Sequence, residues 1–122
     1  MRTVTIALFA FIAPVQFWTS AADAHASLQR AMPLVGSTTP SSPPDLTLDY
    51  SEPIETRFSS IAVMDADGQR VDKRDVHVAP DNPKRLIVGL PALKQGTYKV
   101  EWHIISVDTH RTEGRFTFSI QP

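Results

Sequence analysis

The chain has 122 residues, a formal net charge of −1 and no cysteine. The missing cysteines exclude disulfide frameworks, zinc ribbons and metal sites built on thiolates. A near-neutral chain without a basic run also lacks the electrostatic footprint of proteins that bind nucleic acid or anionic membranes. The length allows one domain with one modest hydrophobic core, whose stability has to come from packing.

The N-terminal segment has the three parts of a secretory signal peptide. A positively charged start precedes an apolar run at residues 4–13, and Ala22 and Ala24 form an A-x-A cleavage motif. The apolar run is too short to span a bilayer and no stop-transfer pattern follows it, which disfavours a membrane anchor. We therefore expect residues 1–24 to be removed during export. Residues 25–122 are then expected to form a single domain without a membrane-inserted segment.

The exported part predicts a series of short strands separated by turns. Residues 33–45 are rich in Pro, Ser, Thr and Gly and predict a loop. The charged stretches 72–75 and 81–85 predict solvated loops, whereas Asp67-Gly68 between apolar residues predicts a hairpin turn. Strands are expected, in chain order, at LTLDYSEP (46–53), SIAV (60–63), RLIVGL (85–90), GTYKVEWHII (96–105) and GRFTFSI (114–120).

Short alternating strands without a convincing helical period indicate an all-β domain, built as an antiparallel β-sandwich or barrel. In each strand the alternation assigns one face to the core. The predicted core residues are Leu28, Leu46, Leu48, Tyr50, Ile61, Val63, Leu86, Val88, Tyr98, Val100, Trp102, Ile104, Phe116, Phe118 and Ile120.

Four histidines lie in the exported part, and some of them come with further potential metal ligands. Asp108 and His110 are two residues apart, a spacing at which the side chains of an extended segment point the same way. One carboxylate oxygen and one imidazole nitrogen could then converge on a metal ion. Taken alone, however, the D-x-H pattern is more typical of a polar loop. His77 and His103 lie among polar neighbours and are expected to be exposed surface residues.

Cleavage at the A-x-A motif makes His25 the first residue of the exported chain, with a cut two residues earlier or later as the alternative. A terminal histidine offers a free α-amine and an imidazole, which can bind one metal ion together. With Asp108 and His110 this set would hold three nitrogens and one oxygen. Such a set suits Cu(II) or Ni(II), and the Irving–Williams order favours Cu(II). A frayed terminus is the plain alternative, and spacing alone does not bring residue 25 to residues 108–110.

The exported part resembles the CopC family of periplasmic copper-binding proteins over essentially its whole length. HASLQRAMPLVGS is similar to the family's histidine-initiated N-terminus, and PPDLTLDYSEPIE to its proline-led strand that ends in Ser-Glu-Pro. GTYKVEWHIISVDTH followed by EGRFTFSI resembles the most distinctive stretch of the family, with Gly-Thr-Tyr, Trp, Ser-x-Asp-x-His, Gly and the final strand. The combination and the order of these pieces carry the resemblance.

This resemblance implies a Greek-key β-sandwich of about seven strands, of cupredoxin-like or immunoglobulin-like type. It also implies one Cu(II) site whose ligands are His25, through its amine and imidazole, Asp108 and His110. Glu52 matches a family glutamate that lies near the copper, and is expected to support the site or to bind weakly. Its alternative is an exposed acid at the end of a strand.

A second site for Cu(I), which some family members carry on a methionine-rich segment, is not expected. Cu(I) needs soft ligands such as thioethers. After processing only Met32 and Met64 remain, far apart in the sequence. His77 is not expected to provide a remnant of such a site.

The expected function is that of a periplasmic protein that sequesters or delivers Cu(II) without catalysis. The resemblance implies an inner-membrane copper transport protein as the partner. One alternative is a metal-free adhesion or assembly module of immunoglobulin type, because a fold does not fix a function. A copper oxygenase is less favoured, because a carboxylate ligand opposes reduction of the copper and the domain is small.

Overall fold

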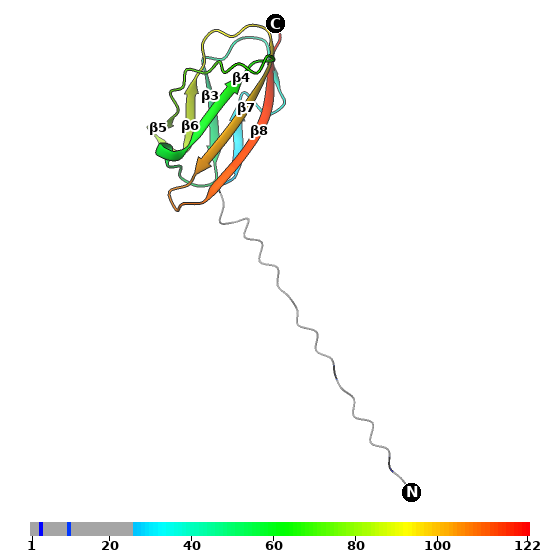
Figure 1. Ribbon diagram of the computed structural model, residues 1–122, viewed down its shortest axis with the longest axis vertical. Coiled ribbons are helices and arrows are strands. Elements are labelled where there is room, and N and C mark those ends of the chain that lie inside the picture. Colours follow the sequence, from blue (N-terminus) through cyan, green and yellow to red (C-terminus); the bar gives the residue numbers. More distant parts are fainter. Residues whose placement is uncertain (1–2, 4–9, 11–25) are drawn as a thin grey trace.

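The structure is a computed structural model that describes residues 3, 10 and 26–122. Residues 26–122 form two packed β-sheets, which Figure 1 shows as two layers of strands. The predicted signal peptide, apart from residues 3 and 10, and His25 lie outside the described residues. Within the described residues, no helix has the length and apolar character needed to cross a membrane.

Each sheet contains four strands. The first sheet has the order β1 (Leu28–Met32), β3 (Asp45–Tyr50), β6 (Asn82–Gly89) and β5 (His77–Ala79), and all its pairs are antiparallel. The second has the order β2 (Thr38–Thr39), β8 (Arg111–Ile120), β7 (Gly96–Ile105) and β4 (Ser60–Met64). A short 3-10 helix, η2 (Thr56–Phe58), precedes β4. The predicted all-β sandwich is confirmed, with eight strands in the described part where about seven were expected.

Strand β2 lies inside the stretch 33–45, which the sequence predicted to be a loop. It is two residues long and pairs in parallel with the end of β8, with Thr38 opposite Ser119. Gly36 makes this possible, because it adopts a φ of +70° and its N–H donates to the carbonyl oxygen of Thr117 at 2.7 Å. Tertiary hydrogen bonds thus recruit part of a proline-rich loop into the sheet edge.

Strand β6 begins at Asn82, earlier than the sequence predicted. The stretch 81–85 was expected to be a solvated loop, but all of it except Asp81 belongs to β6, and Asn82 and Arg85 pair with neighbouring strands. Arg85 lies opposite Asp49 of β3, and its Nε donates to the Asp49 carboxylate at 2.7 Å. A cross-strand ion pair therefore places charged residues within a sheet where composition indicated a loop.

The core lies between the two sheets and matches the predicted alternation. Every predicted core residue is buried except Leu28, which is partly buried against the cluster. In β7, for example, Tyr98, Val100, Trp102 and Ile104 face inward, with exposed or half-buried residues between them. The sequence analysis missed the buried residues Ala26, Ala31, Ile54, Ala79 and Leu90.

Trp102 links the two sheets. Its ring packs edge-on against Tyr50 of the opposite sheet, with ring centroids 5.3 Å apart and an interplanar angle of 72°. Gly114 lies opposite Trp102 in the β7–β8 register. A Cβ atom at Gly114 would overlap the indole ring, so this position admits no side chain without repacking.

The turn after β4 follows the predicted Asp-Gly signal only in part. Gly68 has a φ of +79°, and the Asp65 carboxylate accepts from the N–H of Gln69 at 2.9 Å. The returning chain then pairs with β4 through an isolated bridge between Met64 and Arg70, instead of forming a full hairpin strand.

Asp72 corrects a second expectation, because the charged stretch 72–75 was predicted to be a solvated loop. Its side chain is 0 % exposed and forms an ion pair with Arg70 Nε at 2.8 Å. The same carboxylate accepts from the backbone N–H groups of Val63 at 2.9 Å and Arg74 at 3.1 Å. Burial by itself opposes ionisation, but these bonds and the Arg70 charge outweigh it and hold the pKa of Asp72 below its ordinary value.

Candidate metal centre

The D-x-H pair lies in the turn that joins β7 to β8, at the lower end of the sandwich in Figure 1. The turn is closed by backbone hydrogen bonds from Ser106 N–H to the His110 carbonyl at 3.0 Å and from Thr109 N–H to the Ser106 carbonyl at 2.9 Å. Thr109 has a φ of +71°, an uncommon conformation for a β-branched residue. The segment is thus a tight turn, where the sequence argument had assumed an extended chain.

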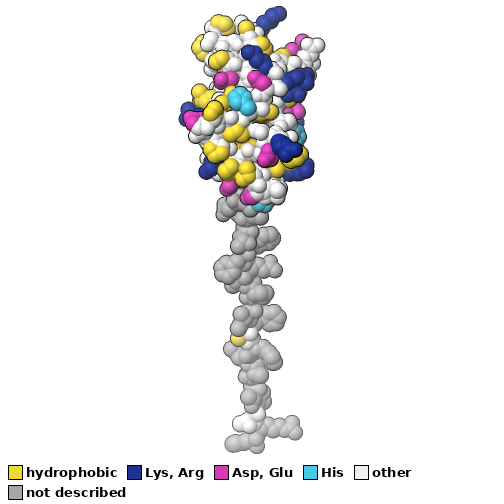
Figure 2. Space-filling view, turned by 90° about the vertical axis from the view of Figure 1, so that its left-hand side faces the viewer, with side chains coloured by type: hydrophobic (Ala, Val, Ile, Leu, Met, Phe, Trp, Pro, Cys, Tyr) yellow, Lys and Arg dark blue, Asp and Glu magenta, His cyan; other side chains and the backbone are white. Residues whose placement is uncertain are grey.

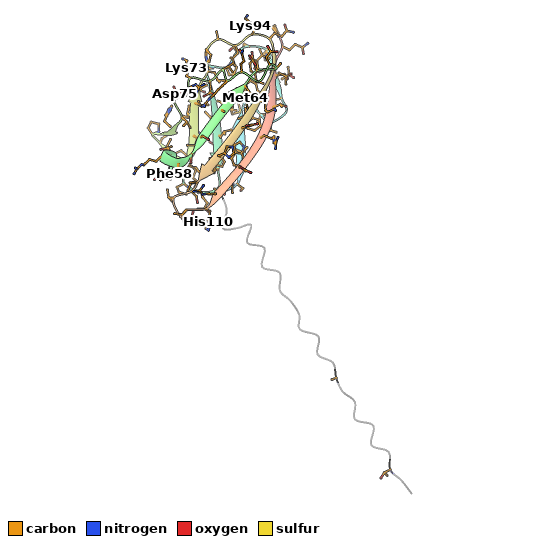
Figure 3. The ribbon with its side chains drawn as sticks, in the orientation of Figure 1. Phe58, Met64, Lys73, Asp75, Lys94 and His110 are labelled. Carbon is orange, nitrogen blue, oxygen red and sulfur yellow. The ribbon has the colours of Figure 1, made fainter. Side chains whose placement is uncertain are left out.

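Within this turn the side chains of Asp108 and His110 face each other. Oδ2 of Asp108 lies 3.3 Å from Nδ1 of His110, with side-chain exposures of 53 % and 38 %. The Nδ1 atom is itself shielded from solvent. Figure 3 shows His110 at the end of the sandwich, well away from Lys73 and Lys94. The turn therefore brings one carboxylate oxygen and one imidazole nitrogen together at one end of the domain.

The electrostatics of the turn favour an ionised Asp108. The pKa of Asp108 lies below its ordinary value, chiefly because the Ser106 hydroxyl donates a hydrogen bond to its carboxylate. Burial raises this pKa in part, and the neighbouring His110 lowers it further. A carboxylate held in its charged form is ready to bind a cation.

The first residues of the described domain are anchored beside this turn. Ala26 is 1 % exposed, and its carbonyl oxygen accepts a hydrogen bond from Oγ1 of Thr112 at 2.8 Å. Ser27 is bonded to Ser51, which directly follows β3, through its N–H at 2.8 Å and through its carbonyl at 2.9 Å. Since Thr112 follows His110 by two residues, Ala26 lies at the same end of the sandwich as the D-x-H pair. His25, which precedes Ala26, is outside the described residues.

Glu52 lies on the segment that lines the other side of the turn. It is half-buried and follows Ser51, and the carbonyl of the next residue, Pro53, accepts from Val107 N–H at 3.0 Å. Among residues 26–122 no group of three or more His, Cys, Asp or Glu side chains is close enough to hold a metal ion. In this turn the described residues thus bring together the Asp108–His110 pair, without a third such side chain, and the role of Glu52 stays a prediction.

The other two described histidines have different partners, and Figure 2 shows histidine side chains at separate places on the surface. His103 is 61 % exposed in β7 and pairs across the strands with Glu113, 3.0 Å from Nδ1 to Oε2. His77 is exposed at the start of β5, with Nδ1 2.8 Å from the carbonyl of Asp75. Both are exposed, as expected from the sequence.

Several residues that shape this end of the domain were not recognised from sequence. Ser106 is 1 % exposed and bonds to both Asp108 and His110, although the sequence analysis quoted it only as part of a motif. Thr112 and Ser51, which hold the N-terminal segment, carry no local signal. Their partners are distant in the chain, so no spacing rule could have identified them.

Comparisons with known proteins agree with this architecture. Residues 28–121 match the model of the protein family that is described as the CopC domain. The chain is 36 % identical to "Protein YobA" of Escherichia coli (strain K12) over 99 residues, covering 80 % of each chain. It is also 36 % identical to "Copper resistance protein C" of Pseudomonas syringae pv. tomato over 107 residues, covering 82 % of this chain and 83 % of that protein.

A solved structure of CopC from Methylosinus trichosporium OB3b superposes with a TM-score of 0.75 and 30 % identity, covering 80 % of this chain and 95 % of that one. The match to the domain covers most of the chain, and both the fold and the sequence identity support it. The protein therefore belongs to the CopC family.

Proposed function

We propose that this protein binds one Cu(II) ion in the periplasm, and holds or delivers it without chemical turnover. The proposed ligands are the α-amine and imidazole of His25, a carboxylate oxygen of Asp108 and the imidazole of His110. Glu52 is proposed to lie near the ion as a supporting or weak ligand. Membership of a family whose relatives include a protein named for copper resistance supports the choice of metal.

The observation that carries this proposal is the position of Ala26 beside the D-x-H turn. Its carbonyl is bonded to Thr112, two residues beyond His110, and Asp108 and His110 lie 3.3 Å apart in the adjoining turn. Ala26 is therefore anchored at the end of the sandwich that carries this pair, and the proposal places the ligand residue directly before it. The fold thereby supports the one step that sequence spacing left open.

The chemistry of the proposed ligand set favours Cu(II). Three nitrogens and one oxygen match the tetragonal N,O coordination that Cu(II) prefers, and Cu(II) stands highest in the Irving–Williams order. The amine and imidazole of one terminal residue would close a chelate ring on the ion. We propose no thioether ligand, since Met32 is exposed at the end of β1 and Met64 lies at the end of β4, which Figure 3 shows away from His110.

Export and processing would complete the site. Removal of residues 1–24 would turn a peptide nitrogen into a free amine at His25, and a neutral amine binds the ion whereas a peptide nitrogen that keeps its hydrogen does not. Copper held in this way could be buffered or passed on, and an inner-membrane copper transport protein is the proposed acceptor.

The proposal is tested by comparing the exported protein, its N-terminus verified by mass spectrometry, with a variant that carries one additional alanine before His25. The alanine converts the amine into an amide. We expect a large loss of Cu(II) affinity in a competition titration and an altered electron paramagnetic resonance spectrum. A variant with the same alanine added after Pro122 is the matched control and should bind as the unmodified protein does. Equal affinity and equal spectra for both variants would show that His25 is not the chelating terminus.

Copper affinity should also fall as the pH falls from 8 to 5. Amine and imidazole ligands must lose their protons to bind a metal ion, and their unperturbed pKa values are about 7.7–8.0 and about 6.5. Asp108, with its lowered pKa, should stay ionised over this range and contribute no dependence. A constant affinity between these pH values would contradict nitrogen ligation.

A further inference from the structure

Ser106 occupies an unusual place in the turn that carries the D-x-H pair. It is 1 % exposed, although serine is a residue that mostly lies at the surface. Its hydroxyl contacts both potential ligands: it donates to Oδ1 of Asp108 and accepts from the backbone N–H of His110 at 3.2 Å. Its own backbone N–H donates to the His110 carbonyl at 3.0 Å.

These contacts engage the Ser106 hydroxyl with both Asp108 and His110. A serine hydroxyl has one proton and two lone pairs, so the proton given to Asp108 and the lone pair offered to His110 link the two residues through one oxygen atom. Oδ1 of Asp108 is then engaged, and Oδ2 is the oxygen that lies 3.3 Å from Nδ1 of His110. The carboxylate thus presents a single oxygen beside the imidazole.

The resulting separation suits two neighbouring ligands on one ion. Metal bonds to nitrogen and oxygen ligands are about 2.0–2.2 Å long in zinc sites, so two atoms that bind one ion have to lie within about 4 Å of each other. Oδ2 and Nδ1, which form an ion pair at 3.3 Å, meet this limit. Side chains held in place before the ligand arrives lose less entropy on binding.

We propose that Ser106 is a positioning residue, which fixes Asp108 and His110 relative to each other before the metal ion binds. This inference rests on the proposed copper site. Outer residues that hold metal ligands by hydrogen bonds typically contribute 10–100-fold to metal affinity. Ser106→Ala should therefore lower Cu(II) affinity by about 10–100-fold.

A matched control is available in Ser59. This serine is also buried at 9 % exposure, and its hydroxyl accepts from Ile105 N–H at 3.0 Å and donates to the Glu55 carbonyl at 2.7 Å. It supports the same end of the domain without a recorded bond to Asp108 or His110. Ser59→Ala should lower stability like Ser106→Ala but change copper affinity by no more than about 2-fold. Ser106→Thr, which keeps the hydroxyl, should retain most of the Cu(II) affinity that Ser106→Ala loses.

Two further readouts separate positioning from a general structural effect. In an Asp108→Ala background, Ser106→Ala should cost less affinity than in the unmodified protein, because the carboxylate that the hydroxyl positions is missing and only its bond to the His110 N–H remains. The copper-saturated Ser106→Ala protein should also give a changed electron paramagnetic resonance spectrum. Equal costs in both backgrounds, or equal losses for Ser59→Ala and Ser106→Ala, would overturn the proposal.

A copper-free measurement distinguishes this inference from the function it rests on. If the unmodified protein fails to bind Cu(II), the proposed function fails, and backbone order parameters then decide the role of Ser106. Ser106→Ala should lower the order parameters of residues 108–110 from about 0.85 toward 0.6, while Ser59→Ala leaves them unchanged. An equally rigid turn in all variants would refute the positioning role.

Discussion

Replacing Thr112 with valine should loosen the N-terminal segment that the proposed copper site needs. Valine keeps the branched shape of threonine but removes the hydroxyl that donates to the Ala26 carbonyl at 2.8 Å. The three hydrogen bonds between Ser27 and Ser51 remain in place. The substitution therefore weakens the attachment of residues 26 and 27 without removing it.

The size of the effect follows from the burial of Ala26. Its carbonyl would lose its donor while the residue stays 1 % exposed in the attached state. Leaving a buried acceptor without its partner costs about 1–3 kcal/mol, and each 1.4 kcal/mol is a factor of about ten in an equilibrium constant. Local opening of the segment should therefore become about 5–150-fold more frequent. Copper affinity should fall by at most the same factor, because binding would have to restore the attached state.

Amide hydrogen exchange at Ser27, measured by NMR on the copper-free exported protein, reports this opening directly because its N–H is bonded to Ser51. Exchange should accelerate in Thr112→Val. Thr117→Val is the control, since it makes the same substitution at an exposed position of the same strand. An unchanged rate at Ser27, or an equal acceleration in both variants, would refute the reasoning.

Two predictions concern stability. Gly114→Ala should destabilise the domain by about 1–3 kcal/mol, because the methyl group of the alanine would overlap Trp102. Urea unfolding, followed through tryptophan fluorescence, measures this loss. A loss of stability below about 0.5 kcal/mol would contradict the tight packing. Asp72→Ala should cost about 2–4 kcal/mol at pH 7, since Val63 loses its buried acceptor and Arg70 its ion pair. Because the folded-state pKa of Asp72 lies below the ordinary value of 3.8, this contribution is fully present above that value and is lost as the pH falls through the folded pKa. A difference between the two proteins that stays constant down to pH 2 would count against it.

Local patterns were sufficient where one face of a strand is buried. The alternation in GTYKVEWHII predicted the inward residues of β7 because successive side chains of a strand point to opposite sides. Composition was misleading at Asp72, where a run of charged residues predicted a solvated loop. Backbone donors of Val63 and Arg74 and the guanidinium of Arg70 satisfy that carboxylate in the interior. The fold brings these partners to the carboxylate, so the charge of Asp72 alone gave the wrong prediction of its exposure.

The sequence by itself determined the all-β class, most of the core and the presence of the D-x-H motif, because each depends on residues close together in the chain. Only the tertiary structure decided that Ala26 lies beside Thr112, 86 residues away, and that Ser106 joins Asp108 to His110 from a buried position. Long-range hydrogen bonds leave no periodic trace in a sequence, since either partner alone is an ordinary polar residue. The first described residues of the domain thus gain their place in the fold through bonds to Ser51 and Thr112, which are distant in the chain.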